Sequence, residues 1–223
     1  MNNKIYTTIE MYQNGASLAY SFVLKYEYPW ELLAGIGEEI IRLGAILPED
    51  KFDIRGKNIW VAKSAKVAKN AYLIGPCIID EWAEIRHCAY IRGSVIVGKN
   101  AVVGNSTELK NCILFDGVQV PHYNYIGDSI LGYKAHMGAG SITSNVKSDR
   151  SLVVIKNGDT NIRTGLKKCG AFLGDFVEVG CGAVLNPGTL IGRNSIVYPL
   201  SSVRGVVGER SIYKSNREVI EKI

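Results

Sequence analysis

The stretch that decides the fold is residues 61–109, VAKSAKVAKNAYLIGPCIIDEWAEIRHCAYIRGSVIVGKNAVVGNSTEL. In it an aliphatic side chain stands at every sixth position, and a mostly small residue follows four positions later, as Ala65 follows Val61. A period of six fits neither an α-helix, with about 3.6 residues per turn, nor an ordinary strand, with about two. It is typical of a parallel β-helix, in which each short strand turns an aliphatic side chain inward and each tight corner admits only a small one. The aliphatic positions are Val61, Val67, Leu73, Ile79, Ile85, Ile91, Val97, Val103 and Leu109.

The period continues along most of the chain, with two slips and one gap. It slips by one residue before Leu114 and again before Leu131, and after a gap it returns over 173–207. We therefore expect an all-β chain whose residues 59–209 form a β-helix of hexapeptide repeats. A β-helix of this kind is a triangular prism that has three flat faces and no crevice. Its site must therefore form where two prisms meet or where a loop covers a face.

An N-terminal arm, residues 1–58, precedes the repeats. Four aliphatic residues in it share one stripe at helical spacing, and Gly44 follows as a helix terminator, which predicts a helix over about residues 30–43. The residues of the stripe are Leu33, Ile36, Ile40 and Leu43.

Two further segments lie outside the period. Residues 145–172 interrupt the coils, and the pair Asn157-Gly158 within them predicts a β-hairpin insert. The tail, residues 210–223, is polar, and we expect it to form a short C-terminal helix that caps the last coil.

Composition narrows the class of protein. The net charge of +5 is mild and no long block of like charges occurs, so we expect no nucleic-acid partner. No apolar run reaches the ~18 residues of a membrane span, and the N-terminus lacks the apolar segment of a secretory signal. Five cysteines, an odd number without a C-x-x-C pair, favour free thiols in a cytoplasmic protein over disulfides or a zinc site.

Several segments resemble one enzyme family. In chain order they are AYIRG, GNSTELKN, VPHYNYIGDSILG, GAGSITSN and LGDFVEVGCGAVLNPGTLIG. Together they resemble the acetyltransferase half of the bifunctional glucosamine-1-phosphate acetyltransferase and N-acetylglucosamine-1-phosphate uridyltransferases. The resemblance extends over residues 28–215, and both the letters YPWELL and the hairpin insert are similar to its archaeal-type branch.

The resemblance implies a fold, a co-substrate and an assembly. Members of the family form left-handed β-helices, use acetyl-CoA, and assemble as homotrimers whose sites are shared between neighbouring copies. We expect the same here, with the 145–172 insert reaching across an interface. The family's nucleotidyltransferase half finds no match, because the nearest approach to its glycine loop, residues 33–39, lies in the helical pattern and lacks the Thr-Arg pair. A separate nucleotidyltransferase is therefore among the expected partners.

The same resemblance assigns roles at the acceptor side of the site. Acyl transfer from a thioester to an amine needs a base, a donor to the developing oxyanion and a grip on both substrates. His122 matches the family's general base, and an ordinary histidine suits this role because it titrates at about pH 6.5. Tyr125 and Asn145 match residues that contact the amino sugar. Arg92 and Lys110 match the positions that bind the phosphate of the acceptor.

The co-substrate side is implied in the same way. Ala139 matches a turn whose backbone amide faces the thioester carbonyl, and its glycine neighbours allow a ligand to approach the backbone closely. Cys181 stands where many relatives have a serine near the coenzyme. Arg204 and Arg217 lie in the last coils and the tail, where the family binds the phosphate end of coenzyme A.

Of three alternatives, one is rejected and two stay open. The histidines His87, His122 and His136 invite comparison with the zinc-binding β-helix carbonic anhydrases. His87 and His122 are two coils apart, however, about 10 Å and too far for one zinc ion, so we expect no metal. The acceptor can be another amino sugar or a sugar nucleotide, because Val146 replaces a tyrosine of the bacterial enzymes. The chain can also be a non-catalytic subunit that binds a sugar nucleotide or serves as a scaffold for a nucleotidyltransferase.

Overall fold

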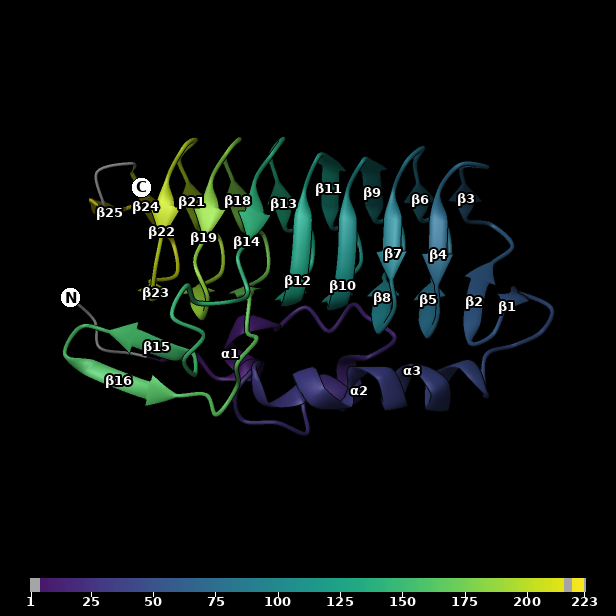
Figure 1. Ribbon diagram of the computed structural model, residues 1–223, viewed down its shortest axis with the longest axis horizontal. Coiled ribbons are helices and arrows are strands. Elements are labelled where there is room, and N and C mark those ends of the chain that lie inside the picture. The colour runs from purple at the N-terminus through teal and green to yellow at the C-terminus, as the bar shows by residue number, and fades with distance from the viewer. Residues whose placement is uncertain (1–4, 215–217, 223) are drawn as a thin grey trace.

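The computed structural model of the chain describes residues 5–214 and 218–222. They form a left-handed parallel β-helix whose coils stack along one axis, with the helical arm lying along one side (Figure 1). The expected fold class is thus confirmed. None of the described helices combines the length and the hydropathy that a bilayer span needs.

Each coil contributes a short strand to each of three faces, and parallel pairing between successive coils joins the strands of a face. The first face contains β4 (Tyr72–Ile74), β7 (Tyr90–Arg92), β14 (Ile142–Thr143), β19 (Val184–Leu185) and β22 (Ser202–Val203). The second contains β2 (Ile59–Ala62), β5 (Cys77–Ile79), β8 (Val95–Val97), β17 (Ala171–Leu173), β20 (Thr189–Ile191) and β23 (Val206–Val207), and β1 (Phe52–Gly56) pairs antiparallel with β2. The longer β10 (Glu108–Leu114) and β12 (Tyr125–Leu131) run through both of these faces. The third face contains β3 (Lys66–Val67), β6 (Glu84–Ile85), β9 (Val102–Asn105), β11 (Gln119–His122), β13 (His136–Met137), β18 (Glu178–Val179), β21 (Ile196–Val197), β24 (Ser211–Tyr213) and β25 (Val219–Glu221).

The two long strands explain the slips in the period. Their mutual pairing is continuous except at one residue of each strand, Asn111 and Asp128, where the corner between the first and the second face lies. Both residues have φ of +49°, in the left-handed region that Asn and Asp tolerate better than other side chains. Because this corner uses one residue fewer, the aliphatic period shifts by one at Leu114 and Leu131.

The periodic aliphatic residues fill the interior of the prism. Val61, Ile79 and Leu109 are completely buried, and parallel pairing stacks Val61 directly against Ile79 of the next coil. Burial of each such side chain contributes about 1.5–3 kcal/mol relative to its exposure. The repeated stacking of like residues is therefore what the six-residue period encodes.

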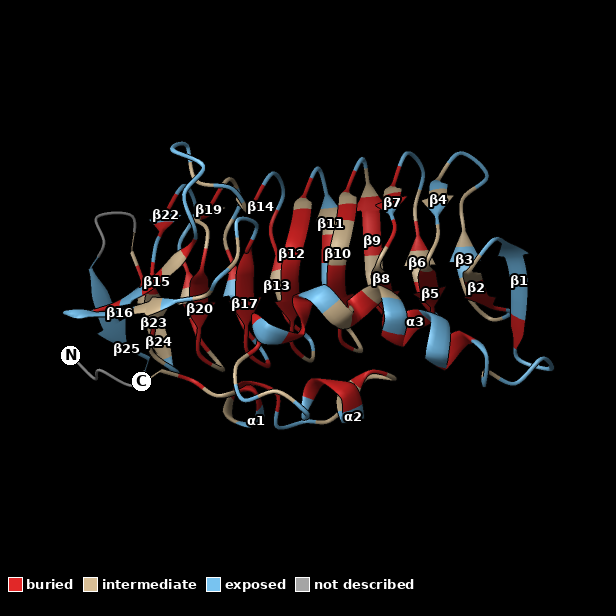
Figure 2. Cartoon of the chain, turned by 60° about the horizontal axis from the view of Figure 1, so that its bottom comes forward, coloured by how far each residue is buried: buried red, intermediate tan, exposed pale blue. Residues whose placement is uncertain are grey.

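The N-terminal arm covers the second face. It contains α1 (Thr8–Met11), α2 (Tyr20–Val23), the 3₁₀ helix η1 (Glu31–Gly35) and α3 (Ile36–Gly44), of which the last two lie where the sequence predicts a helix. The strands beneath the arm are largely buried (Figure 2). Even their outward side chains are apolar and have no exposed surface, so this face is part of the core. These side chains are Ile78, Ile96, Ile113, Ile130, Phe172 and Leu190.

The insert forms a hairpin at the predicted turn. β15 (Val154–Asn157) pairs antiparallel with β16 (Thr160–Arg163), and Gly158 between them has φ of +57°. The base of the hairpin packs on its own prism, where Val153 and Ile155 are buried beside Gly188. A reach of this insert across an interface between copies stays a prediction.

The expected C-terminal helix is wrong for the described part of the tail. β24 continues the third face and pairs antiparallel with β25, which places Ile212 opposite Ile220. The last coil presents unpaired backbone N–H and C=O groups at its edge, and a returning strand satisfies them where a helix would not. Arg217 lies outside the described residues.

Candidate active site

A row of residues marks the edge between the third and the first face. Successive coils place His87, Asn105, His122, Ala139 and Cys181 there, each about 4.8 Å from the next. We call this row the His122 edge. It brings together three of the predicted site residues, His122, Ala139 and Cys181, from three consecutive coils.

The backbone of His122 is fixed while its side chain is exposed. Its N–H donates to Oδ1 of Asn124 at 3.1 Å, and its carbonyl accepts from the Gly140 amide at 3.0 Å. Asn124 is itself buried, and its Nδ2 donates to the carbonyls of Gly138 and Ser141 at 2.8 and 3.1 Å. The imidazole therefore projects from a rigid corner to a surface that a substrate can reach.

Ala139 offers a hydrogen-bond donor on the coil next to that of His122. The residue is exposed, and its backbone N–H donates no hydrogen bond to any residue that the structure describes. The turn depends on its glycine neighbour, since a Cβ at Gly138 would lie 2.9 Å from Sγ of Cys181. An unused N–H beside a candidate base is the arrangement that stabilises the oxyanion of acyl transfer.

A polar cluster lies around the corner from the edge, on the first face. Tyr125 opens β12 three residues after His122, and Nδ2 of Asn145 donates to its hydroxyl at 3.2 Å. The same nitrogen donates to the Asp128 carboxylate at 2.5 Å, and Nζ of Lys110 lies 3.1 Å from that carboxylate. Three of the four predicted acceptor-binding residues thus belong to one hydrogen-bonded group, built from three consecutive coils.

Arg92, the fourth of them, lies on the coil next to Lys110, at the end of β7. Its guanidinium forms an ion pair with Glu108 at 2.6 Å, and the hydrogen bond that it donates to this carboxylate raises the pKa of Arg92 above its ordinary value. Both side chains are partly exposed. Because a guanidinium has five N–H donors, this pairing leaves others for an anion.

Tyr125 keeps its proton at neutral pH. Burial raises the pKa of its phenol; the hydrogen bond from Asn145 lowers it, and the negative charges of Asp128 and Glu108 raise it further. The hydroxyl is therefore a neutral group that accepts from Asn145 and retains an O–H to donate.

The predicted coenzyme residues are not all in one place. Cys181 is exposed on the His122 edge. Arg204 follows β22 on the other side of the first face, where it lines a pocket of about 290 Å³ together with Lys147 and Asn186. Arg217 cannot be placed, because it is outside the described residues.

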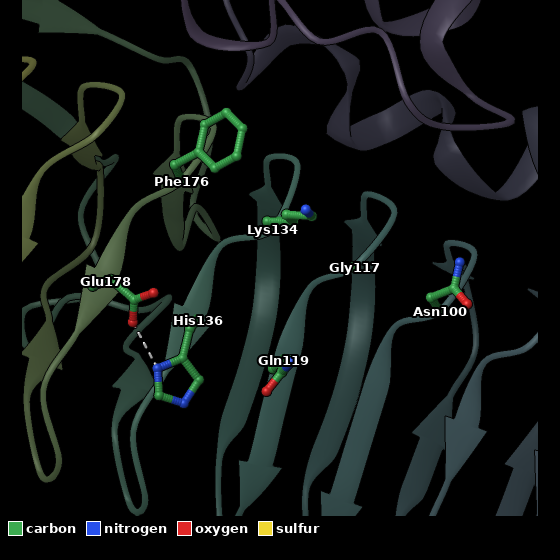
Figure 3. Close-up of a pocket in the computed structure, with 7 residues that line it drawn as sticks. All are labelled: Asn100, Gly117, Gln119, Lys134, His136, Phe176 and Glu178. Atoms are coloured by element: carbon green, nitrogen blue, oxygen red, sulfur yellow. Dashed lines mark hydrogen bonds and ion pairs between the residues drawn. The ribbon is translucent and has the colours of Figure 1, made fainter.

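A second pocket, of about 560 Å³, lies on the third face (Figure 3). In its wall, Nδ1 of His136 lies 2.8 Å from Oε2 of Glu178, and Gln119 and Lys134 lie alongside. From the sequence, we consider His136 only as one of three histidines in a possible zinc site, and we expect no metal. Among the described residues, no group of three His, Cys, Asp or Glu side chains is placed to hold a metal ion.

Sequence reasoning missed Asp128 and Asn124. Both belong to the HYNYIGD segment that contains His122 and Tyr125, so their proximity was a signal in principle. Their partners, however, lie on neighbouring coils, such as Lys110 and Asn145, which are 18 and 17 positions from Asp128. Only the register of the coils brings these residues together.

Comparison with known proteins confirms the resemblance. The family model of the GMPPB C-terminal domain matches residues 73–166. The bifunctional protein GlmU of Methanococcus vannielii is 32% identical over 185 residues, covering 74% of this chain and 44% of that protein. The bifunctional sugar-1-phosphate nucleotidylyltransferase/acetyltransferase of Sulfurisphaera tokodaii is 31% identical over 166 residues, covering 74% and 41%. The chain thus spans less than half the length of these curated relatives. Among solved structures, WeeI of Acinetobacter baumannii AYE is similar with a TM-score of 0.38 and 14% identity, over 69% of this chain and 57% of that one.

Proposed function

We propose that the protein is an acetyl-CoA-dependent N-acetyltransferase that acts on an amino sugar phosphate, with glucosamine 1-phosphate as the first acceptor to test. The observation that carries the proposal is the exposed imidazole of His122 on the coil next to the unused amide of Ala139, with the Lys110–Tyr125–Asn145 cluster around the corner. The names of the curated relatives agree with it, since one of them is described as an acetyltransferase as well as a nucleotidylyltransferase.

In the proposed reaction His122 is the general base. It takes a proton from the sugar's amine as the amine nitrogen forms a bond to the thioester carbonyl carbon. The carbonyl oxygen becomes an oxyanion, to which the Ala139 N–H donates. The carbon–sulfur bond then breaks, and the leaving thiolate receives the proton from His122. The products are the N-acetylated sugar and free coenzyme A, so the balance needs no further reactant.

The acceptor is proposed to lie on the first face beside the edge. Arg92 and Lys110, on neighbouring coils, bind its phosphate, and Tyr125 and Asn145 contact its sugar hydroxyls. This position brings the amine of the sugar around the corner towards His122. On the co-substrate side, Cys181 is a small residue along the path of the coenzyme, and Arg204 and Arg217 bind its phosphate end.

A neighbouring copy of the chain is proposed to complete the site. The imidazole and the Ala139 amide lie on an open edge, so one chain provides only one wall around the reacting groups. Enclosure by protein strengthens hydrogen bonds to a developing charge. We therefore infer a homotrimer with its sites between copies. A separate nucleotidyltransferase would supply its substrate or use its product.

The test is thiol release from acetyl-CoA in the presence of glucosamine 1-phosphate and a panel of other amino sugars. We expect His122→Ala to lower kcat by about 10²–10⁴-fold, the usual contribution of a general base. The matched control is His87→Ala, an exposed histidine on the same edge two coils away, which should retain activity within about twofold. Folded wild-type protein that releases no thiol with any amino sugar would instead favour the non-catalytic binding or scaffold role.

A further inference from the structure

The acceptor-side cluster has a buried carboxylate at its centre. Asp128 is only 3% exposed, and its two oxygens are contacted by three side chains from the two neighbouring coils. Lys110 Nζ lies 3.1 and 3.2 Å from the two oxygens, Nδ2 of Asn111 donates to one at 2.9 Å, and Nδ2 of Asn145 donates to the other at 2.5 Å.

The backbone around this carboxylate is held in place as well. Asp128 occupies the single-residue corner of β12, with φ of +49°. Its carbonyl accepts from the Gly170 amide at 2.7 Å, and the carbonyl of Asn145 accepts from the Cys169 amide at 3.0 Å. The chain therefore fixes Asp128 and Asn145 together at the point where it returns from the hairpin insert to the prism.

The charge of Asp128 decides where its partners point. A buried ionised carboxylate is stable only when hydrogen bonds and an opposite charge compensate it. Lys110 provides the charge, while Asn111 and Asn145 provide amide donors. In return, the ammonium of Lys110 and the amide of Asn145 are held by a common acceptor, and Asn145 in turn reaches the Tyr125 hydroxyl.

We infer that Asp128 is the positioning residue of the acceptor site. It sets the side chains of Lys110 and Asn145, and through Asn145 that of Tyr125, without touching the reacting atoms. This role rests on the proposed function, because it concerns the residues proposed to bind the acceptor. It predicts that loss of the Asp128 charge weakens acceptor binding and leaves binding of the thioester unchanged.

The test is steady-state kinetics of Asp128→Asn in the full chain. Asparagine retains the shape and tolerates the left-handed corner, but its amide would face the donors of Lys110 or Asn145. We expect KM for the acceptor to rise by roughly tenfold or more, and KM for acetyl-CoA to stay within about twofold. The matched control is Asp175→Asn, another buried aspartate, which accepts from the backbone N–H groups of Asn14 and Tyr133 at 2.9 Å.

Both substitutions remove a buried carboxylate, so both can lower Tm, but only Asp128→Asn should change KM for the acceptor.

A double-mutant cycle adds a readout that a merely structural role would not change. In a Lys110→Met background, Asp128→Asn should change KM for the acceptor by less than about half the fold-change that it produces alone. Equal acceptor KM in Asp128→Asn and Asp175→Asn, with active wild type, overturns the role of Asp128 alone. Wild-type protein without activity on any amino sugar overturns the proposed function and this role together.

Discussion

Three aspartates of the prism, Asp80, Asp128 and Asp175, are buried and a fourth, Asp116, is half-buried, and their surroundings differ. Asp175 and Asp116 accept from backbone N–H groups, Asp175 from Asn14 in the arm and Asp116 from Lys99 on the neighbouring coil. The Asp128 carboxylate instead accepts hydrogen bonds from three side chains. In Asp80, Oδ1 accepts from the Glu81 amide, but the other oxygen, Oδ2, is buried without a partner among the described residues. Asp175 and Asp116 therefore join neighbouring backbone segments, and Asp128 positions side chains. Asp80 is left with one buried carboxylate oxygen that has no partner among the described residues.

Asp80 makes the stability of the fold depend on pH. Burial raises the pKa of its carboxyl to about 6, well above the ~3.9 of an exposed aspartate. Because the folded pKa exceeds the unfolded one, the folded state holds the proton more tightly. The resulting stability is complete below about pH 4 and is lost as the pH rises through about 6.

Asp80→Asn, which is neutral at every pH, should therefore raise the free energy of unfolding relative to wild type at pH 8, by on the order of 2 kcal/mol. At pH 4.5 the two proteins should differ much less, because Asp80 is then largely protonated in the fold. Urea unfolding of both proteins at the two pH values measures the difference. An equal gain at pH 4.5 and pH 8 would show that charge is not the cause.

At the scale of elements, the arm decides which face of the prism is core. Ile96 points outward from β8, yet it has no exposed surface because α3 lies over it. Ile74 points outward from β4 on the first face, which the arm does not cover, and it is 39% exposed. Comparing Ile96 with Ile74 therefore shows how much burial the arm adds at an outward strand position.

We expect Ile96→Ala to lower the free energy of unfolding by about 2–5 kcal/mol, because it leaves a cavity between the arm and the strand. Ile74→Ala should lower it by less than about 1 kcal/mol, since water already reaches that side chain. Chemical denaturation of both variants against wild type gives the comparison. Similar losses in the two variants would mean that the arm packs more loosely on the second face than the structure shows.

The sequence predicted elements wherever local pattern determines them. Six-residue spacing was enough for the coils, and Asn157-Gly158 was enough for the hairpin turn. The tail was wrong because strand pairing of Ile212 with Ile220 depends on the open edge of the last coil, which composition does not reveal. In the candidate site, the family resemblance predicted His122, Tyr125 and Lys110. Asp128 was missed because its importance comes from partners on other coils.

At the scale of the whole molecule, the arm also limits how copies can meet. The second face is filled by the chain's own helices, so the first and third faces and the edge between them carry the exposed candidate groups. Both the His122 edge and the acceptor cluster lie on this side. An assembly that used this edge would therefore enclose the candidate site, and one that used the arm would leave it open.

Activity should consequently depend on assembly. We expect light scattering to give three times the 24.4 kDa mass of one chain at working concentration. On dilution, thiol release per chain should fall in parallel with the trimer fraction, because a dissociated chain keeps only one wall of the site. Thermal unfolding of the diluted protein is the control, since a prism with its own complete core should remain folded after it dissociates. Constant activity per chain in a sample shown to be monomeric would mean that one chain holds the whole site, and the second wall would then have to come from its own hairpin insert.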